Sequence, residues 1–275
     1  MFPLFFGSAD RQLYGVYHMP EVAVARSVGA VLCAPILHEA VDAHRAMRAL
    51  ADQLARAGVH TLRFDYSCTG DSAGAAEDAR VDRWIDDIGA AVDELKASRG
   101  LDAVGLVGLR FGATLAARLA SASDQLPFVA LWEPIVDGAP YVRDLHELQE
   151  HWVSFEAQQR PGAKTATTPH EIFGNPFPPA LENGVVEQRL LELSTELAPR
   201  VLIVDEGVPG HELAPDAYAG LDALDTRLRE GSATVERRHI DGGQVWHRDF
   251  DASHAPVPRE LVSQIVGWIT DEAVP

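Results

Sequence analysis

The chain has 275 residues, 47% of them hydrophobic, which suits one large α/β domain carrying an insertion. Its formal net charge of −18 disfavours nucleic acid, anionic membranes and a strongly acidic carrier protein as partners. The two cysteines, Cys33 and Cys68, are too few for a disulfide framework and lie in no metal-ligand spacing, so we expect a cytoplasmic protein without a metal or other cofactor.

The first predicted elements are two antiparallel strands, residues 2–7 and 13–19. The apolar start of the chain lacks the basic region and the cleavage site of a signal peptide, so we assign it to the first strand. No run of the sequence approaches the roughly 18 apolar residues that a membrane span needs.

From residue 28 onward, strand-like and helix-like patterns alternate, which predicts a parallel sheet with crossover helices. The expected fold is therefore a mostly parallel eight-stranded α/β sheet flanked by helices. The predicted strands are 28–34, 59–65, 103–107, 128–132, 201–204 and 233–239, and the predicted helices are 42–57, 81–97, 111–120, 141–158 and 258–269.

The regular alternation breaks between residues 138 and 198. This interval holds a predicted helix followed by two proline-containing stretches, 161–169 and 175–179. Long irregular insertions of this kind are typical of functional lids. We therefore predict a cap at 138–198, inserted between the two parts of a core, 1–137 and 199–275.

The most informative stretch is Gly108–Gly112, which lies between an apolar strand and a helix of small residues. Glycines flank a sharp turn there, because the turn is tight and its neighbours pack closely. The pattern is typical of a nucleophile elbow, whose apex normally carries the attacking serine. The apex residue here is Arg110, and a guanidinium stays protonated and cannot attack a carbonyl.

Four motifs occur in the order found in one family of bacterial hydrolases. They are LCAPILHE at 32–39 with AHR at 43–45, LRFDYSCTGDSAG at 62–74, GLRFGATLA at 108–116, and LWEPIVDGAPY at 131–141. Together they resemble the serine-aminopeptidase-like α/β-hydrolases, including the branch associated with exosortase systems and natural-product gene clusters. The resemblance covers most of the chain outside the cap. It implies the α/β-hydrolase fold and arginine as a branch feature at the apex, whereas Cys68 replaces a more usual glycine.

Two interpretations of Arg110 stay open. A cation at a helix N-terminus opposes the helix dipole, whereas an anion there gains from both the dipole and the guanidinium. Arg110 therefore either binds a carboxylate, a phosphate or a developing oxyanion of a ligand, or it folds onto an internal acid. Glu39 and Glu133 are the candidate acids, and such a pair would fill a disused site.

Backbone amides form the second part of the predicted site. The amide of Phe111, with one from the loop that contains Ile36 and Leu37, is in the position that donates to an oxyanion. His38 and Glu39 follow that loop directly. The Glu39 carboxylate is a candidate partner of Arg110 or a general base that activates water.

Histidine and carboxylate candidates come from the end of the chain. His247 follows the last predicted strand and is the candidate base, with His254 further on. Asp205 ends the preceding strand and is the candidate acid. Cys68 is an alternative nucleophile if its pKa is lowered. The other acids that stay open are Glu206, Glu212, Asp216, Glu133 and Asp137.

Two functions remain open at this point. The first is an enzyme that acts on an ester, thioester or lactone-like intermediate of a biosynthetic pathway without a serine acyl-enzyme. The second is a non-catalytic protein that binds an anionic ligand or a partner protein. Both predict a small-molecule acyl or carboxylate-containing partner, and a homodimer is compatible with either. A displaced nucleophile, Ser72, is a third alternative, although its motif is not an elbow.

Overall fold

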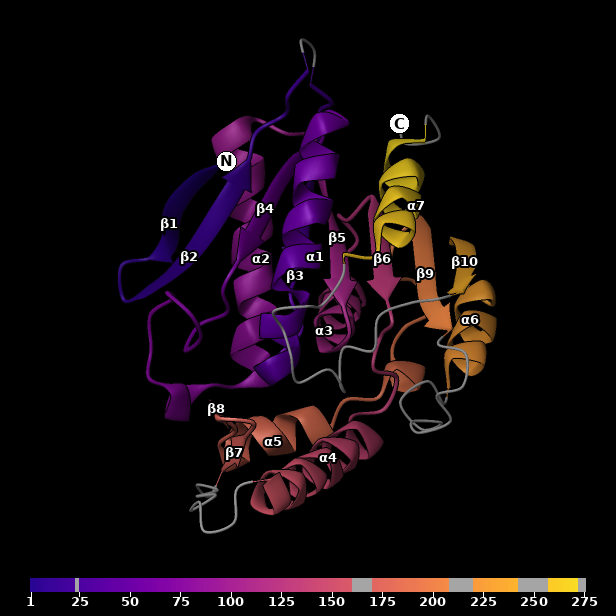
Figure 1. The fold of residues 1–275 in the computed structure, drawn as a ribbon. Coiled ribbons are helices and arrows are strands. Elements are labelled where there is room, and N and C mark those ends of the chain that lie inside the picture. The colour runs from indigo at the N-terminus through magenta and orange to yellow at the C-terminus, as the bar shows by residue number, and fades with distance from the viewer. Residues whose placement is uncertain (23–24, 160–169, 208–219, 242–256, 272–275) are drawn as a thin grey trace.

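The computed structural model describes residues 1–22, 25–159, 170–207, 220–241 and 257–271. This described part forms an eight-stranded sheet in the order β1-β2-β4-β3-β5-β6-β9-β10 (Figure 1). The first two strands pair antiparallel, as predicted, and β2 pairs antiparallel with β4, whereas all the pairs from β4 to β10 are parallel. The strands are β1 (Phe2–Ser8), β2 (Arg11–His18), β3 (Val28–Cys33), β4 (His60–Phe64), β5 (Ala103–Leu109), β6 (Phe128–Trp132), β9 (Arg200–Gly207) and β10 (Thr234–Asp241).

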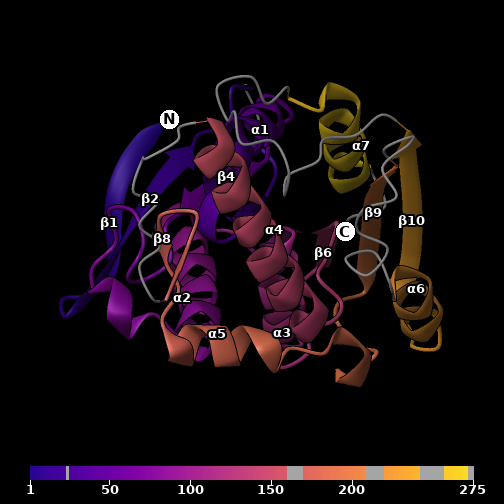
Figure 2. The same ribbon diagram turned by 60° about the horizontal axis from the view of Figure 1, so that its bottom comes forward.

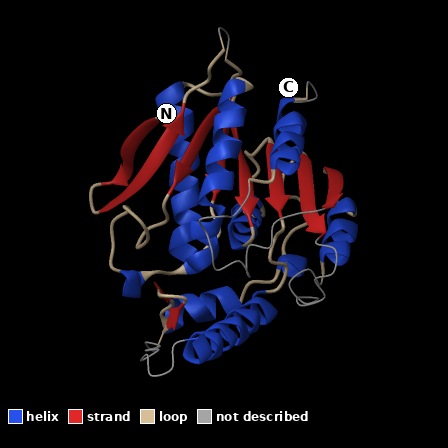
Figure 3. Ribbon diagram, in the orientation of Figure 1, coloured by secondary structure: helices blue, strands red, loops and turns tan. Residues whose placement is uncertain are grey.

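Helices cover both faces of the sheet (Figure 3). Apolar residues of α1 (Leu37–Arg56) and α7 (Arg259–Thr270) pack on one face, and those of α2 (Val81–Arg99), α3 (Phe111–Ala120) and α6 (Leu221–Arg229) pack on the other. Because both faces are covered, the central strands are almost continuous apolar runs. The predicted eight-stranded, mostly parallel sheet is confirmed.

The covering helices are amphipathic. In α1 the apolar side chains of Met47, Leu50 and Leu54 recur at helical spacing and are buried against the sheet. Within the described ranges, the structure contains no helix with the length and apolar character needed to cross a membrane.

Some element boundaries differ from the prediction. Helix α1 begins at Leu37 and not at Asp42. The sequence did not indicate this start, because no capping side chain marks it and Leu37 has a φ of 57°. Helix α6 lies where no helix is predicted. A short 3₁₀ turn, Ala76–Asp78, precedes α2.

Residues 138–159 and 170–192 lie across the carboxyl ends of the parallel strands (Figures 1 and 2). We call α4, α5 and the β7–β8 hairpin, including Phe173 in its turn, the roof. The base of this excursion is closed by hydrogen bonds from the Gly138 amide to the Gln188 carbonyl (2.9 Å) and from the Leu190 amide to the Val136 carbonyl (2.8 Å). The elements are α4 (Gly138–Gln159), β7 (Glu171–Ile172), β8 (Asn175–Pro176), α5 (Pro179–Val186) and a 3₁₀ turn at Leu190–Glu192.

Candidate functional site

The turn between β5 and α3 has the strained backbone expected of an elbow. Arg110 is the single residue between the two elements, with φ 54° and ψ −123°. A positive φ is uncommon for a residue other than glycine and costs free energy that the surroundings must offset. The Arg110 amide donates to the Trp132 carbonyl at 2.9 Å, which fastens the turn to the end of β6.

The two glycines of the turn are required by close backbone contacts. A Cβ atom on Gly108 would lie 2.4 Å from the Cα of Ala113. A Cβ atom on Gly112 would lie 2.3 Å from the carbonyl oxygen of Cys33 at the end of β3. Both distances are far below van der Waals contact, so the predicted reason for these glycines is confirmed.

The side chain of Arg110 lies in a buried ion pair. Only 1% of Arg110 is exposed, and its Nε and Nη2 atoms donate to Oε1 of Glu39 at 3.2 and 3.1 Å. The other carboxylate oxygen, Oε2, accepts a hydrogen bond from the Tyr141 hydroxyl at 3.0 Å. Of the two interpretations of Arg110, the structure therefore has the internal pair, with Glu39 as a partner.

Tyr141 is a residue of this cluster that the sequence analysis did not select. It belongs to α4, and its ring stacks on that of Phe111 with centroids 6.0 Å apart and planes inclined by 7°. Burial, with the neighbouring Glu39 carboxylate, raises the pKa of Tyr141 well above its usual value, so the hydroxyl stays a donor. The available signal was its place at the end of the fourth motif.

His38 lies beside the cluster in the first turn of α1. Its ring packs against Phe173 of the roof with centroids 4.5 Å apart. Both ring nitrogens are buried, and neither has a hydrogen-bond partner among the residues that the structure describes. Burial lowers the pKa of His38, the Glu39 carboxylate opposes that shift, and the Arg110 cation adds to it. The ring is therefore held neutral at neutral pH.

The predicted amide donors lie next to the same cluster. Phe111 is the first residue of α3 and Leu37 is the first residue of α1, with Ile36 at its N-cap. The first amides of a helix have no acceptor within their own helix. The contact between Glu39 and Arg110 brings these two helix starts together, which is compatible with an oxyanion site. That role stays a prediction.

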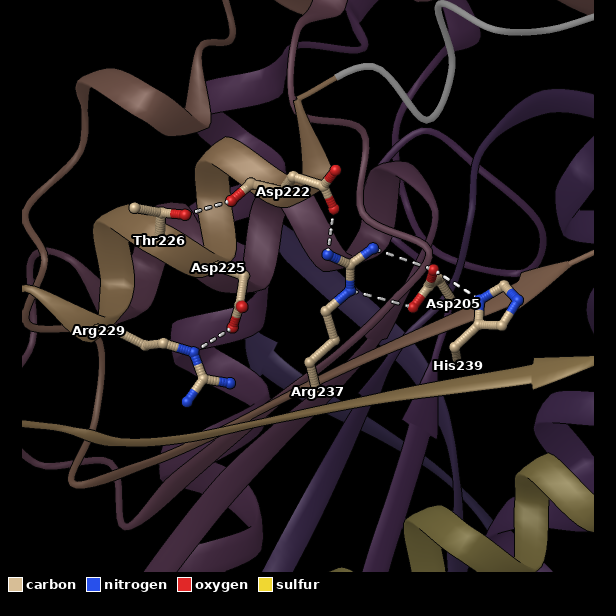
Figure 4. A network of polar contacts seen from close by, with 7 residues as sticks. All are labelled: Asp205, Asp222, Asp225, Thr226, Arg229, Arg237 and His239. Atoms are coloured by element: carbon tan, nitrogen blue, oxygen red, sulfur yellow. Dashed lines mark hydrogen bonds and ion pairs between the residues drawn. The ribbon is translucent and has the colours of Figure 1, made fainter.

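Glu133 and Asp205 are placed differently from Glu39. Glu133 follows β6 with a φ of 45°, is 1% exposed, and its amide donates to the Val204 carbonyl at 2.8 Å. Asp205 lies within β9, two residues before its end, and its carboxylate binds Arg237 through two hydrogen bonds of 3.3 and 3.2 Å (Figure 4). Nδ1 of His239 lies 3.0 Å from the same carboxylate.

Asp205 therefore belongs to a network of β9, β10 and α6, in which Arg237 also contacts Asp222 (Figure 4). Hydrogen bonding to Asp205, more than to Asp222, raises the pKa of Arg237 above its usual value. Among the described residues, the polar partners of the Asp205 carboxylate are Arg237 and His239, which belong to β10 and not to the elbow. The sequence signal that could have indicated this network is the alternation of side chains along a strand, because Arg237 and His239 are two positions apart and therefore lie on the same face of β10.

Several predicted residues lie outside the described part of the chain. They are His247, His254, Glu212 and Asp216, and the side chain of Glu206 is likewise not described. Their roles stay predictions.

A cavity of about 720 Å³ opens between the core and the roof. Leu37 of α1, Trp84 of α2 and Leu181 of α5 are among its lining residues. Two aromatic residues of the lining, Tyr66 and Trp84, use their polar atoms in hydrogen bonds to the backbone. The Tyr66 hydroxyl donates to the Ala34 carbonyl (3.0 Å), and Trp84 Nε1 donates to the Ser67 carbonyl (2.9 Å). These rings therefore present carbon to the cavity.

Neither cysteine has the environment of a nucleophile. Cys68 lines the cavity, but burial raises the pKa of its thiol, which is opposite to the change that nucleophilic attack needs. Cys33 is fully buried in β3, and burial raises the pKa of its thiol as well. Cys33 is therefore a core residue of the sheet.

The loop after β4 is ordered by turn hydrogen bonds. The Asp71 amide donates to Oδ2 of Asp65 at 3.0 Å, and the Ser72 hydroxyl donates to the Asp65 carbonyl at 2.6 Å. The Ser72 oxygen also accepts from the Tyr14 amide at 2.8 Å. Ser72 thus connects this loop to β2 and has the geometry of a structural residue.

Comparison with known proteins identified matches only among solved structures, since no family model and no curated protein matches the sequence. Est1E from Butyrivibrio proteoclasticus, solved with bound ferulic acid, is 17% identical with a TM-score of 0.67, over 99% of this chain and 100% of that chain. A proline iminopeptidase from Mycobacterium smegmatis is 13% identical with a TM-score of 0.64, over 100% of both chains. An α/β serine hydrolase without a lid from Xanthomonas campestris is 15% identical with a TM-score of 0.61, over 100% of this chain and 95% of that chain. These similarities establish the fold: the chain has the predicted α/β-hydrolase fold.

Proposed function

On an α/β-hydrolase fold whose elbow apex is arginine, we propose a non-catalytic binding protein for a small acyl or carboxylate-containing ligand with an apolar body. The ligand occupies the cavity beneath the roof. The observation that carries the proposal is the buried ion pair, because Arg110 is bonded to Glu39 and is absent from the cavity lining.

The ion pair argues against a working elbow. A hydrolase of this fold needs a nucleophile at the apex, and the apex side chain here is a cation whose charge Glu39 balances. Separating the pair would leave two uncompensated buried charges, which costs several kcal/mol. Both oxygens of Glu39 accept hydrogen bonds, so this carboxylate is poorly placed to take a proton from water.

The cavity has the size and chemistry of a small-molecule site. Ligand pockets commonly measure about 300–1,000 Å³ and combine apolar walls with a few polar groups. The inner walls of this cavity are aromatic and aliphatic, whereas His44 and Arg45 lie at its exposed side on α1. Burial and two neighbouring arginines lower the pKa of His44, which leaves Arg45 as the cation that meets a ligand carboxylate.

The test is a fluorescence titration with 8-anilinonaphthalene-1-sulfonate, which joins aromatic rings to an anionic group. Ala40→Trp fills the cavity that Ala40 lines, and Ala49→Trp places the same side chain at another half-buried alanine of α1 that does not line it. We expect the wild type and Ala49→Trp to bind alike, and Ala40→Trp to bind about tenfold more weakly. Equal binding by the two variants overturns the proposal.

A second candidate function is an enzyme that acts on an ester, thioester or lactone-like intermediate in a biosynthetic pathway. The retained elbow backbone supports it, since φ 54° at Arg110 gives the strained turn after which working members of the fold use the next backbone amide as an oxyanion donor. In this alternative Arg110 stabilises a developing oxyanion while His247 or Glu39 activates water.

Turnover of acyl esters and thioesters decides between the two candidates. Wild-type turnover above that of both Arg110→Ala and His247→Ala would establish the enzyme and exclude the non-catalytic proposal. We expect equal background rates for the three proteins. A fluorophosphonate probe should label none of them. Labelling would support the alternative in which a serine such as Ser72 is the nucleophile.

A further inference from the structure

Three consecutive residues of α1 connect the cavity, the roof and the elbow. Leu37 lines the cavity. The ring of His38 packs on Phe173 of the roof. Glu39 accepts a hydrogen bond from the hydroxyl of Tyr141, which also belongs to the roof. The first turn of α1 therefore contacts the roof at two points directly beside the cavity wall.

The roof is fastened together as one unit. Gln149 of α4 donates to the Glu171 carbonyl at 2.9 Å and accepts from the Phe173 amide at 2.6 Å. Nε2 of His146 lies 2.8 Å from Oε1 of Glu182 in α5. Because these contacts join α4 to the hairpin and to α5, a change at Tyr141 is transmitted to the residues that cover the cavity.

The contacts of Glu39 differ in what it costs to break them. Arg110 and Glu39 both belong to the core, and their ion pair does not depend on the roof. Release of Tyr141 removes its hydrogen bond to Glu39, its stacking on Phe111 and the contact of its ring with the Arg110 guanidinium, while the two buried charges stay paired. Separation of the roof would thus expose apolar side chains such as Phe177 and Leu181, which are buried with the core, but would leave no uncompensated buried charge.

We propose that Arg110, Glu39 and Tyr141 form a clasp that holds the roof on the core, and that opening of this clasp admits ligand to the cavity. Arg110 holds the Glu39 carboxylate in place, and Tyr141 is the donor that leaves. The arginine at the elbow apex is then a positioning residue for the roof. The second half of this inference rests on the proposed binding function.

Hydrogen exchange in the unliganded full chain tests the clasp directly. Tyr141→Phe keeps the ring on Phe111 and removes the hydroxyl, and Tyr17→Phe is the matched control, because its hydroxyl lies 2.7 Å from Nδ1 of His60 at the β2 side of the sheet. We expect Tyr141→Phe to raise exchange in α4 and α5 about tenfold and to leave α3 unchanged. Unchanged exchange in the roof, or an equal rise in Tyr17→Phe, overturns the clasp.

Stopped-flow mixing with 8-anilinonaphthalene-1-sulfonate tests the second half. The association rate constant should rise in Tyr141→Phe and stay at the wild-type value in Tyr17→Phe. Faster exchange of the roof with an unchanged association rate overturns the role of the clasp in ligand entry. If Ala40→Trp and Ala49→Trp bind the probe alike, the proposed binding function fails and ligand entry fails with it, while the exchange measurement still decides the clasp.

Discussion

Among single residues, Arg110 and Glu39 depend most strongly on one another. Their exposed fractions are 1% and 0%, so each charge has lost nearly all contact with water. A buried charge whose partner is removed keeps the desolvation cost and loses the compensating attraction, which destabilises a protein by about 3–5 kcal/mol. Replacing both members by neutral side chains of similar size removes the charges together and avoids most of that cost.

This dependence predicts strong coupling in a double-mutant cycle. Arg110→Met and Glu39→Gln should each lower the free energy of unfolding by about 3–5 kcal/mol, and the double variant should lose far less than the sum. Urea denaturation measures all four proteins. Additive losses, within about 0.5 kcal/mol, would show that the two charges are not coupled.

At the level of elements, the elbow depends on how closely α3 approaches β3. Its glycines could be read from the sequence because the turn, its strand and its helix are adjacent in the chain. The start of α1 could not be predicted from the sequence, because Leu37 begins the helix with a φ of 57° and no capping side chain marks this position. The tertiary packing of that turn against the roof and the elbow overrides the missing local signal.

Two glycine-to-alanine substitutions separate close packing from helix propensity. Gly112→Ala should destabilise the protein by about 1–3 kcal/mol, because its Cβ would lie 2.3 Å from the Cys33 carbonyl oxygen. Gly89→Ala in α2 should stabilise it by about 0.5–1 kcal/mol, because a Cβ there meets no atom within 4 Å. Thermal denaturation measures both, and a Gly112→Ala variant as stable as the wild type would contradict the packing argument.

For the whole molecule, four histidines with lowered pKa values contribute to the response to acid. Burial is the largest cause that lowers the pKa of His18, His38, His44 and His60. The unfolded chain therefore binds protons that the folded chain does not, so stability falls as pH decreases below 6.5 toward the folded pKa of each group.

The free energy of unfolding should accordingly decrease from about pH 7.5 to about pH 5.5. His18 is 2% exposed, lies 2.8 Å from an Asp52 oxygen and accepts a hydrogen bond from Arg63. His18→Gln should therefore reduce this pH dependence, whereas His151→Gln, at an exposed position of α4, should not. Denaturant titrations at several pH values measure the slopes, and equal slopes in the two variants would exclude His18 as a source.

The sheet, the elbow and the cation at its apex could be predicted from the amino-acid sequence. Those features follow from apolar periodicity and from glycines next to one another in the chain, so local patterns specify them. The pairing of Arg110 with Glu39 could not be predicted in the same way, because Glu39 lies 71 positions away in the chain and Glu133 is an equally acidic candidate. The tertiary structure also assigned Asp205 to Arg237 and brought Tyr141 to the elbow. A buried charge takes the partner that the crossover helices and the roof place within hydrogen-bond distance, and no local pattern records that distance.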